Sequence, residues 1–154
     1  MTTPDLSTSP AAFIDRYLPL NEKGKPWTLS PYQRKVLAVG AALIGVIRIL
    51  LWGELKKSGK TLLIACKGIW WGFTRPYTEI KVVANDLEQS VGRVFKTMTD
   101  LLKHNPELMR SVKRITATTI ELTNGTVIQA ISSDYRGAAG STRHSSKLIE
   151  NTAL

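Results

Sequence analysis

Apolar residues recur at helical spacing in the middle of the chain. They are Leu87, Val91, Val94, Phe95, Met98, Leu101 and Leu102. Steps of three and four residues place them on one face of a helix. Asn85 and Glu88 match a capping box at the start, and Asn105 with Pro106 matches a helix end. The pattern therefore predicts an amphipathic helix over residues 85–104.

Shorter segments add further helices and strands. Ser30 followed by Pro31 is typical of a helix start, with the serine as N-cap and the proline in the first turn, and predicts a helix over residues 31–42. A buried helix is predicted over residues 60–72 and a strand over residues 80–84. This alternation of helices and strands favours an α/β fold with a parallel sheet.

The second half of the chain changes from a helical to a β-rich sequence pattern. Residues 114–132 hold two β-rich runs that meet at Asn124 and Gly125, a pair that tolerates the positive φ of a tight turn. They predict a β-hairpin. The polar residues 133–154 predict no strand, and residues 1–12, rich in Thr, Ser and Pro, predict a mobile tail.

One apolar segment allows two interpretations. Residues 36–52 are apolar except for Arg48, and a membrane span needs roughly 20 such residues. The alternative is the end of the helix over residues 31–42, a break near Gly45 and a buried strand over residues 46–52. An arginine inside the segment favours the alternative, which also places a strand directly before a glycine loop.

Composition narrows the class of protein and of partner. The chain has 154 residues, 43% of them hydrophobic, which suits one domain with a core. A formal net charge of +9 favours an anionic partner such as nucleic acid, nucleotide or a membrane surface. The single cysteine, Cys66, excludes an internal disulfide and makes a zinc site improbable. The N-terminus lacks the pattern of a signal peptide.

The stretch LWGELKKSGKT, residues 51–61, carries the candidate chemistry. Gly59, Lys60 and Thr61 match the end of a phosphate-binding loop, in which backbone N–H groups cradle phosphates, the lysine adds charge and the hydroxyl binds Mg²⁺. The full pattern needs a glycine at position 54, which is glutamate here. The loop is therefore a nucleotide site or a basic turn, and the flanking strand and helix favour the nucleotide site.

Four segments together resemble one protein family. They are LSPYQRKVL with Gln33, ELKKSGKT with Lys56, IKVVANDLEQSVGRVF, and IELTNGTVIQAISSD followed by Gly140. Their order and spacing over residues 27–144 resemble the N-terminal ATPase region of the large terminase subunit of tailed bacteriophages, the motor that packages DNA into proheads. The resemblance implies an α/β P-loop NTPase fold of the RecA or ASCE type, a parallel sheet flanked by helices with a β-hairpin insertion.

The resemblance also implies a site for ATP and Mg²⁺. Gln33 would read the adenine base, Thr61 would hold Mg²⁺ through the nucleotide, and Lys56 and Lys60 would act in catalysis. The nucleotide-binding residues it implies are Gln33, Lys56, Lys57, Ser58, Gly59, Lys60 and Thr61. For Lys56 and Lys57, the residues alone leave open whether they are solvated surface lysines or a second cation near the γ-phosphate.

The end of the chain departs from the family pattern. The family continues with a hydrophobic run that closes in Asp-Glu, whereas this chain reads RHSSKLIENTAL. Glu150 is either a stand-in for the catalytic acid or a surface glutamate, and the nuclease domain has no counterpart. We therefore expect a flexible segment over residues 1–26, a partial ATPase domain with an incomplete sheet over residues 27–154, and little turnover, as in a truncated or frame-disrupted gene of a prophage.

The leading functional hypothesis is the ATP-binding part of a DNA-packaging motor. By resemblance, its partners would be double-stranded phage DNA, the terminase small subunit and the portal, in the host bacterial cytoplasm and without a membrane. A helicase-like P-loop NTPase would need further motifs. A protein of another class, a non-catalytic basic protein that binds DNA or a terminase subunit, remains the alternative.

Overall fold

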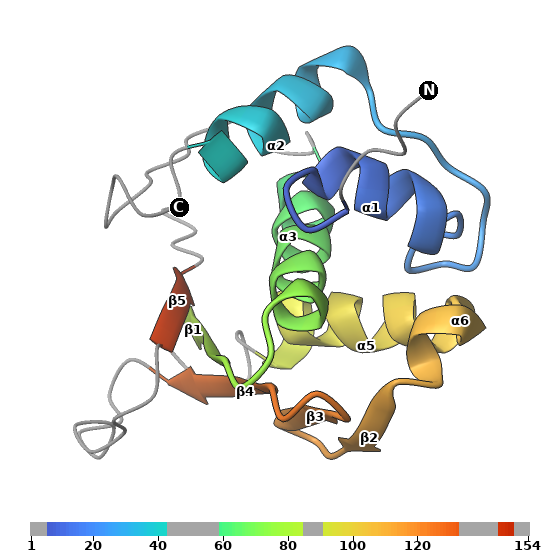
Figure 1. Cartoon of the computed structure of the whole chain (residues 1–154). Coiled ribbons are helices and arrows are strands. Elements are labelled where there is room, and N and C mark those ends of the chain that lie inside the picture. Colours follow the sequence, from blue (N-terminus) through green and yellow to red (C-terminus); the bar gives the residue numbers. More distant parts are fainter. Residues whose placement is uncertain (1–5, 43–58, 85–90, 133–144, 150–154) are drawn as a thin grey trace.

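The computed structural model describes residues 6–42, 59–84, 91–132 and 145–149 (Figure 1). The elements in chain order are α1 (Pro10–Tyr17), α2 (Pro31–Ala42), α3 (Lys60–Thr74), β1 (Glu79–Ala84), the π-helical turn η1 (Val91–Phe95), α5 (Lys96–His104), α6 (Pro106–Met109), β2 (Val112–Ile115), β3 (Thr119–Leu122), β4 (Val127–Ser132) and β5 (Ser145–Ile149). The fold is α/β, as the alternating pattern predicts.

The five strands form one mixed sheet in the order β2-β3-β4-β1-β5. Strands β4, β1 and β5 are parallel, whereas β2, β3 and β4 are antiparallel. The predicted hairpin is confirmed as β3–β4, and the predicted parallel pairing is confirmed for β4, β1 and β5, whereas the antiparallel strands β2 and β3 make the sheet mixed and not parallel throughout. Because β4 pairs with β1 along its whole length, from Val127 opposite Glu79 to Ser132 opposite Ala84, the hairpin strand lies inside the sheet.

Two strands, β2 and β5, were not predicted from the sequence. The turn between β2 and β3 is closed by Thr116, whose Oγ1 accepts a hydrogen bond from the backbone N–H of Thr119 at 3.0 Å, and it lacks the glycine, proline or asparagine that usually marks a turn. β5 lies in the polar tail for which no strand was predicted. It pairs in parallel with β1, from Ser145 opposite Glu79 to Ile149 opposite Val83.

The described helices pack on one face of the sheet. In Figure 1 the strands run along the lower part of the molecule, α3 and α5 lie above them, and α1 and α2 lie above α3. A Cβ atom added at Gly72 of α3 would lie 3.4 Å from side-chain atoms of Ile80, Leu122 and Thr126. This close approach places apolar residues of β1 and β3 under the helix, and the sheet residues Ile80, Ile120 and Ile128 are fully buried.

The N-terminal segment is part of the packed structure. Ser9 caps α1 by accepting a hydrogen bond from the N–H of Ala12 at 3.3 Å, and Phe13 and Ile14 are buried. The indole N–H of Trp70 donates to the backbone oxygen of Leu6 at 2.9 Å. The mobile tail predicted over residues 1–12 is therefore wrong for residues 6–12, because α1 buries an apolar face on α3 that composition alone does not reveal.

Other predicted helices agree with the structure. α2 has the predicted bounds, α3 continues two residues beyond the predicted end, and η1 with α5 accounts for residues 91–104. Asn105 ends α5: its side-chain amide donates to Leu101 O at 2.8 Å and to Leu20 O at 2.9 Å. The proposed capping box at Asn85 and the strand over residues 46–52 lie outside the described residues. Within the described ranges, no helix has the length and apolarity needed to cross a bilayer.

Candidate nucleotide site

The start of α3 is a helix N-terminus without a side-chain cap. Its N-cap, Gly59, has φ 84° and ψ 15°, the left-handed conformation that glycine adopts at little cost, and no side chain caps the helix there. The carbonyl of Gly59 accepts the first helical hydrogen bond, from Leu63 N at 3.0 Å. The N–H groups of the first turn and the positive end of the helix dipole therefore lie at a terminus that can receive an anion.

Lys60 and Thr61 are the first two residues of this helix. Both are half-buried, and α3 continues for 15 residues, long enough for a developed helix dipole. The sequence prediction that the helix starts directly after Gly59 is confirmed. The chemical roles of Lys60 and Thr61 stay predictions at this point.

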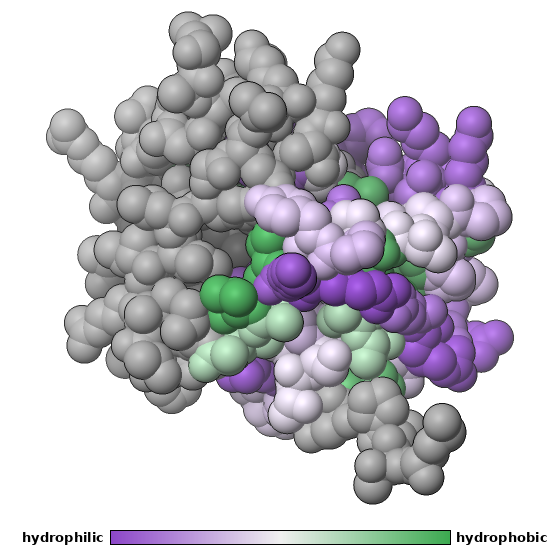
Figure 2. Space-filling model, turned by 90° about the horizontal axis from the view of Figure 1, so that it is seen from above, coloured by the Kyte–Doolittle hydropathy of each residue, from purple (hydrophilic) through white to green (hydrophobic). Residues whose placement is uncertain are grey.

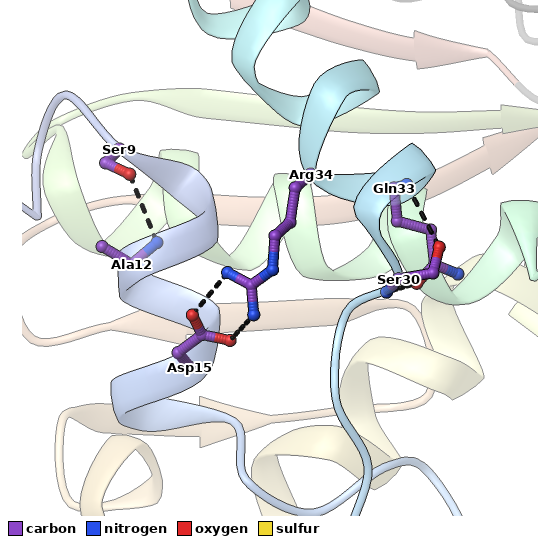
Figure 3. Close-up of polar contacts among 6 residues, drawn as sticks. All are labelled: Ser9, Ala12, Asp15, Ser30, Gln33 and Arg34. Carbon is purple, nitrogen blue, oxygen red and sulfur yellow. Dashed lines mark hydrogen bonds and ion pairs between the residues drawn. The ribbon is translucent and has the colours of Figure 1, made fainter.

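Gln33 lies beside Gly59, although 25 residues separate them in the sequence. The side-chain Nε2 of Gln33 is 3.3 Å from the position that a Cβ atom would take at Gly59. The other end of the amide is fixed, because its Oε1 accepts a hydrogen bond from Ser30 N at 2.9 Å, while Ser30 Oγ accepts one from Gln33 N at 3.2 Å (Figure 3). The amide NH₂ group of Gln33 is thereby held at the start of α3.

This reciprocal pair is a capping box of the Ser-x-x-Gln type. The sequence predicts Ser30 as the N-cap of α2, and the structure adds its hydrogen bonding with Gln33. The signal was available, since Gln33 stands three residues after the capping serine. Gln33 therefore combines a structural hydrogen bond through its oxygen with an amide donor that faces the glycine.

An ion pair fixes the direction of α2. The guanidinium group of Arg34 donates to both carboxylate oxygens of Asp15 on α1, at 2.7 and 2.9 Å (Figure 3). The hydrogen bonds to Asp15 are the main reason that the pKa of Arg34 is raised. Both side chains are partly exposed, so the pair contributes at most about 1 kcal/mol. Its value for the site is that it orients the helix that carries Gln33.

The strands end on the same side of the sheet as α3 begins. A short turn over residues 75–78 joins α3 to β1, so the two elements run in opposite directions, and β5 is parallel to β1. In Figure 1 the tips of β1 and β5 point toward the level of α2 and the start of α3. Ligands of open α/β sheets bind at this carboxyl edge.

Several residues implied by the resemblance lie outside the described residues. They are Lys56, Lys57, Ser58 and Glu150. In the sequence, Glu150 directly follows β5, whose last residue is Ile149. The structure therefore brings together Gln33 and Gly59, places Lys60 and Thr61 after them, and does not test the remaining site residues.

Two further observations limit other kinds of site. Among the described residues, no group of three or more His, Cys, Asp or Glu side chains is placed to hold a metal ion. Burial raises the pKa of the Cys66 thiol, so Cys66 is a packing residue and not a nucleophile.

A pocket of about 400 Å³ lies apart from the candidate nucleotide site and involves neither Gln33 nor Gly59. Its lining residues are Ser7, Thr8, Ser9, Pro10, Ala11, Ala38, Ala41, Ala42, Trp70 and Arg75.

The crystal structure of the HK97 bacteriophage large terminase has a similar fold. The TM-score is 0.74 at 24% sequence identity, and the match covers 87% of this chain. No family model matches the sequence, and no curated protein matches it. This chain thus shares its fold with part of a large terminase, and it corresponds to 29% of the length of the HK97 protein.

Proposed function

We propose that this chain is the nucleotide-binding part of a bacteriophage DNA-packaging motor of the large terminase type. The observation that supports this most is the closeness of Gln33 to Gly59: an amide donor lies against the N-terminus of a helix whose first residues are Lys60 and Thr61. A nucleotide carries phosphates, which a helix N-terminus can bind, and a base, with which a side-chain amide can form hydrogen bonds. The fold shared with part of the HK97 large terminase agrees with the proposal.

Each residue of the site has a distinct proposed role. ATP supplies the phosphoanhydride bond whose hydrolysis would drive DNA translocation. Backbone N–H groups from Ser58 to Thr61 would hold its phosphates, Lys60 would neutralise their charge, and the Thr61 hydroxyl would take a place on Mg²⁺. Gln33 would recognise the adenine through its amide. The absence of a side chain at Gly59 suits this arrangement, because a Cβ would crowd the Gln33 amide at 3.3 Å.

The proposed P-loop NTPase chemistry has two further candidates. Lys56 and Lys57 precede the loop and would place additional positive charge near the γ-phosphate, where charge develops during phosphoryl transfer. In the sequence, Glu150 follows β5, whose last residue Ile149 lies at the carboxyl edge of the sheet. We therefore propose Glu150 as the group that would accept a proton from the attacking water.

The wider role of the protein follows from the same proposal. The motor would act on double-stranded DNA, with the terminase small subunit and the portal as protein partners, in the cytoplasm of the bacterial host. These partners belong to a whole packaging motor, and this chain spans 29% of the length of the HK97 large terminase.

Nucleotide binding by the Lys60→Ala variant tests the proposal. We expect the unmodified chain to bind ATP with Mg²⁺ and Lys60→Ala to bind at least about tenfold more weakly, since a charge-assisted contact to phosphate is worth roughly 1.5–3 kcal/mol. Binding would be measured by calorimetry. Lys67→Ala is the matched control, because Lys67 lies two turns further along α3, about 10 Å away along the helix axis, and should leave the affinity unchanged.

The same experiment can contradict the proposal. Equal ATP affinity of the unmodified chain and Lys60→Ala would remove Lys60 from the site, and a loss shared by Lys67→Ala would indicate damage to α3 as a whole. Turnover is measured alongside. If the chain hydrolyses ATP, Glu150→Gln should abolish turnover and preserve binding, and full activity of Glu150→Gln would exclude Glu150 as the catalytic base.

A further inference from the structure

Exposed basic side chains gather along one side of the molecule, away from β5 and the start of α3. They come from the loop after α1, the end of α5, the segment after α6 and the edge strand β2. We call this set the basic edge; its members are Lys23, Lys25, Lys103, His104, Arg110, Lys113 and Arg114. In Figure 1 the loop after α1, α6 and β2 follow one another down the right-hand side. Figure 2 shows the hydrophilic residues of one face of the molecule in purple.

Tertiary contacts hold the parts of the basic edge together. The position of a Cβ atom at Gly24 is 3.0 Å from His104 Nδ1, so the turn that carries Lys23 and Lys25 packs on the end of α5. The Asn105 side chain accepts a hydrogen bond from Leu20 N at 3.1 Å and donates one to Leu20 O at 2.9 Å. Segments that lie far apart in the sequence thus form one continuous surface.

The basic edge carries little compensating negative charge. Within the described part of the chain, none of its seven members makes an ion pair. Glu107, between α5 and β2, is already held by Arg16 through contacts of 3.1 and 3.3 Å. Glu121 lies opposite Arg114 in the register of β3 with β2 and offsets part of one charge. Among the described residues, the other lysines and arginines of the basic edge face solvent without a carboxylate partner.

Protection of the edge strand β2 from pairing with another chain explains only some of the unpaired basic side chains of the basic edge. Charged side chains such as Lys113 and Arg114 keep an edge strand from pairing with another chain. That function does not require Lys23, Lys25 or Lys103, which lie on a turn and a helix. Basic side chains from four different segments that lie on one surface without ion-pair partners are typical of an electrostatic footprint for a polyanion.

We propose that the basic edge binds the phosphate backbone of double-stranded DNA. Proteins that bind single strands stack bases on exposed aromatic rings. The exposed aromatic residues of the described chain, Tyr32 and Tyr77, belong to α2 and to the turn before β1, and the large apolar side chain exposed near the basic edge is Met109. The basic edge therefore offers charge without stacking groups, which suits the contacts that position a protein on a duplex.

If the chain is part of a DNA-packaging motor, the basic edge is the surface with which it contacts DNA. The DNA-binding proposal depends on the proposed function in one respect, the choice of DNA over another polyanion as the ligand. The surface shares no residue with the nucleotide site. Binding is therefore measured without nucleotide, and Lys60→Ala is included. A chain that binds DNA but not ATP, or ATP but not DNA, would separate the two proposals.

The test is binding to a fluorescent duplex at several salt concentrations. With about five phosphates neutralised, log K should fall with log salt with a slope near −4.5 over roughly 50–200 mM. Lys113→Glu and Lys103→Glu should each weaken binding about tenfold and reduce the slope by about 1–2, whereas removal of one phosphate contact reduces it by about 1. Lys35→Glu, at an exposed lysine of α2, changes the net charge equally and should reduce affinity less than about twofold.

Four results would overturn the proposal. The first is an unmodified chain that binds no duplex at about 50 mM salt. The second is an equal loss of affinity in Lys35→Glu, which would make the effect one of net charge. The third is a clear preference for single-stranded DNA. The fourth is unchanged affinity in both Lys113→Glu and Lys103→Glu, with circular dichroism showing that both variants are folded.

Discussion

Gly59 and Gly125 have nearly the same positive φ in two different surroundings. Their φ angles are 84° and 82°. Among the described residues, the side-chain atom near the position that a Cβ would take at Gly59 is the Gln33 amide nitrogen at 3.3 Å, whereas at Gly125 two atoms of the Tyr77 ring lie at 2.6 and 2.7 Å. The first glycine begins a helix beside a side-chain amide, and the second lets an aromatic ring lie directly on a turn.

The surroundings of Gly125 form a hydrogen-bonded joint. The hydroxyl of Thr126 donates to Arg75 O at 2.8 Å, the amide of Asn124 donates to Gly72 O at 2.9 Å, and Tyr77 N donates to Asn124 O at 3.3 Å. Tyr77 itself has a positive φ of 57°, a conformation that costs a residue other than glycine roughly 1–2 kcal/mol. The joint ties the end of α3 to the β3–β4 hairpin, so its role is to hold the fold.

Gly125→Ala should have the largest effect on stability. The positive φ costs about 1–2 kcal/mol and the clash with the Tyr77 ring about 1–3 kcal/mol more, so the free energy of unfolding should fall by about 2–5 kcal/mol. Urea denaturation measures this change. The double variant Gly125→Ala/Tyr77→Gly should recover the part due to the clash. ATP affinity of the folded protein should not change, and a loss of affinity would break the contrast between the two glycines.

Gly59→Ala should destabilise the protein less but impair binding. Only the backbone term of about 1–2 kcal/mol applies to the free energy of unfolding, because the amide of Gln33 can move away from a new methyl group. That movement displaces the amide from the start of α3, and we expect ATP affinity to fall at least about tenfold, as for loss of a hydrogen bond to a charged group worth about 1.5–3 kcal/mol.

Gly24→Ala is the matched control for Gly59→Ala. Gly24 also has a positive φ, 71°, and a neighbour at 3.0 Å, the ring of His104. Its substitution should lower stability by a similar amount and leave ATP affinity intact. If Gly24→Ala and Gly59→Ala reduce the affinity equally, the loss reflects general destabilisation and the N-terminus of α3 has no special role.

The two glycines also differ in how far the sequence predicts their surroundings. Asn124-Gly125 predicts its own turn, and Gly59 with Lys60 predicts a helix start, because both signals are local. The contact of Gln33 with Gly59 depends on the packing of α2 near α3, and the sequence indicated it only through a family resemblance. The Tyr77 ring over Gly125 was not predicted, since nothing local distinguishes Tyr77 from a surface tyrosine.

For the strands too, the sequence predicts what depends on local signals and does not predict what depends on tertiary contacts. β1 and the β3–β4 hairpin have apolar runs and a turn signal of their own, and both were predicted. β5 was missed because SSKLI is short and mixed, and its pairing with β1 joins residues far apart in the sequence, such as Glu79 and Ser145. A parallel neighbour can make a strand of a segment with weak propensity, since strand formation depends on pairing and packing more than on local preference.

Gln33→Glu should have the smallest effect on stability, and it tests most directly whether the surroundings of Gly59 bind a ligand while those of Gly125 only hold the fold. Glutamate keeps a side-chain oxygen for the hydrogen bond from Ser30 N, now 2.9 Å long, and capping boxes use glutamate as readily as glutamine. The free energy of unfolding should therefore change by less than about 0.5 kcal/mol. The amide donor beside Gly59 is lost and a negative charge takes its place near the phosphates. ATP affinity should fall at least about tenfold, since this substitution combines a lost hydrogen bond with charge repulsion worth roughly 1.5–3 kcal/mol.

Gln33→Ala completes this comparison by removing both ends of the amide. It should lose ATP affinity as Gln33→Glu does and also destabilise α2 by about 0.5–2 kcal/mol through the broken cap. Calorimetry and urea denaturation on the two variants then separate the structural oxygen of Gln33 from its proposed binding nitrogen. If Gln33→Glu binds ATP as well as the unmodified chain, Gln33 serves only as a cap, and its position against Gly59 is a packing contact like that of Tyr77 against Gly125.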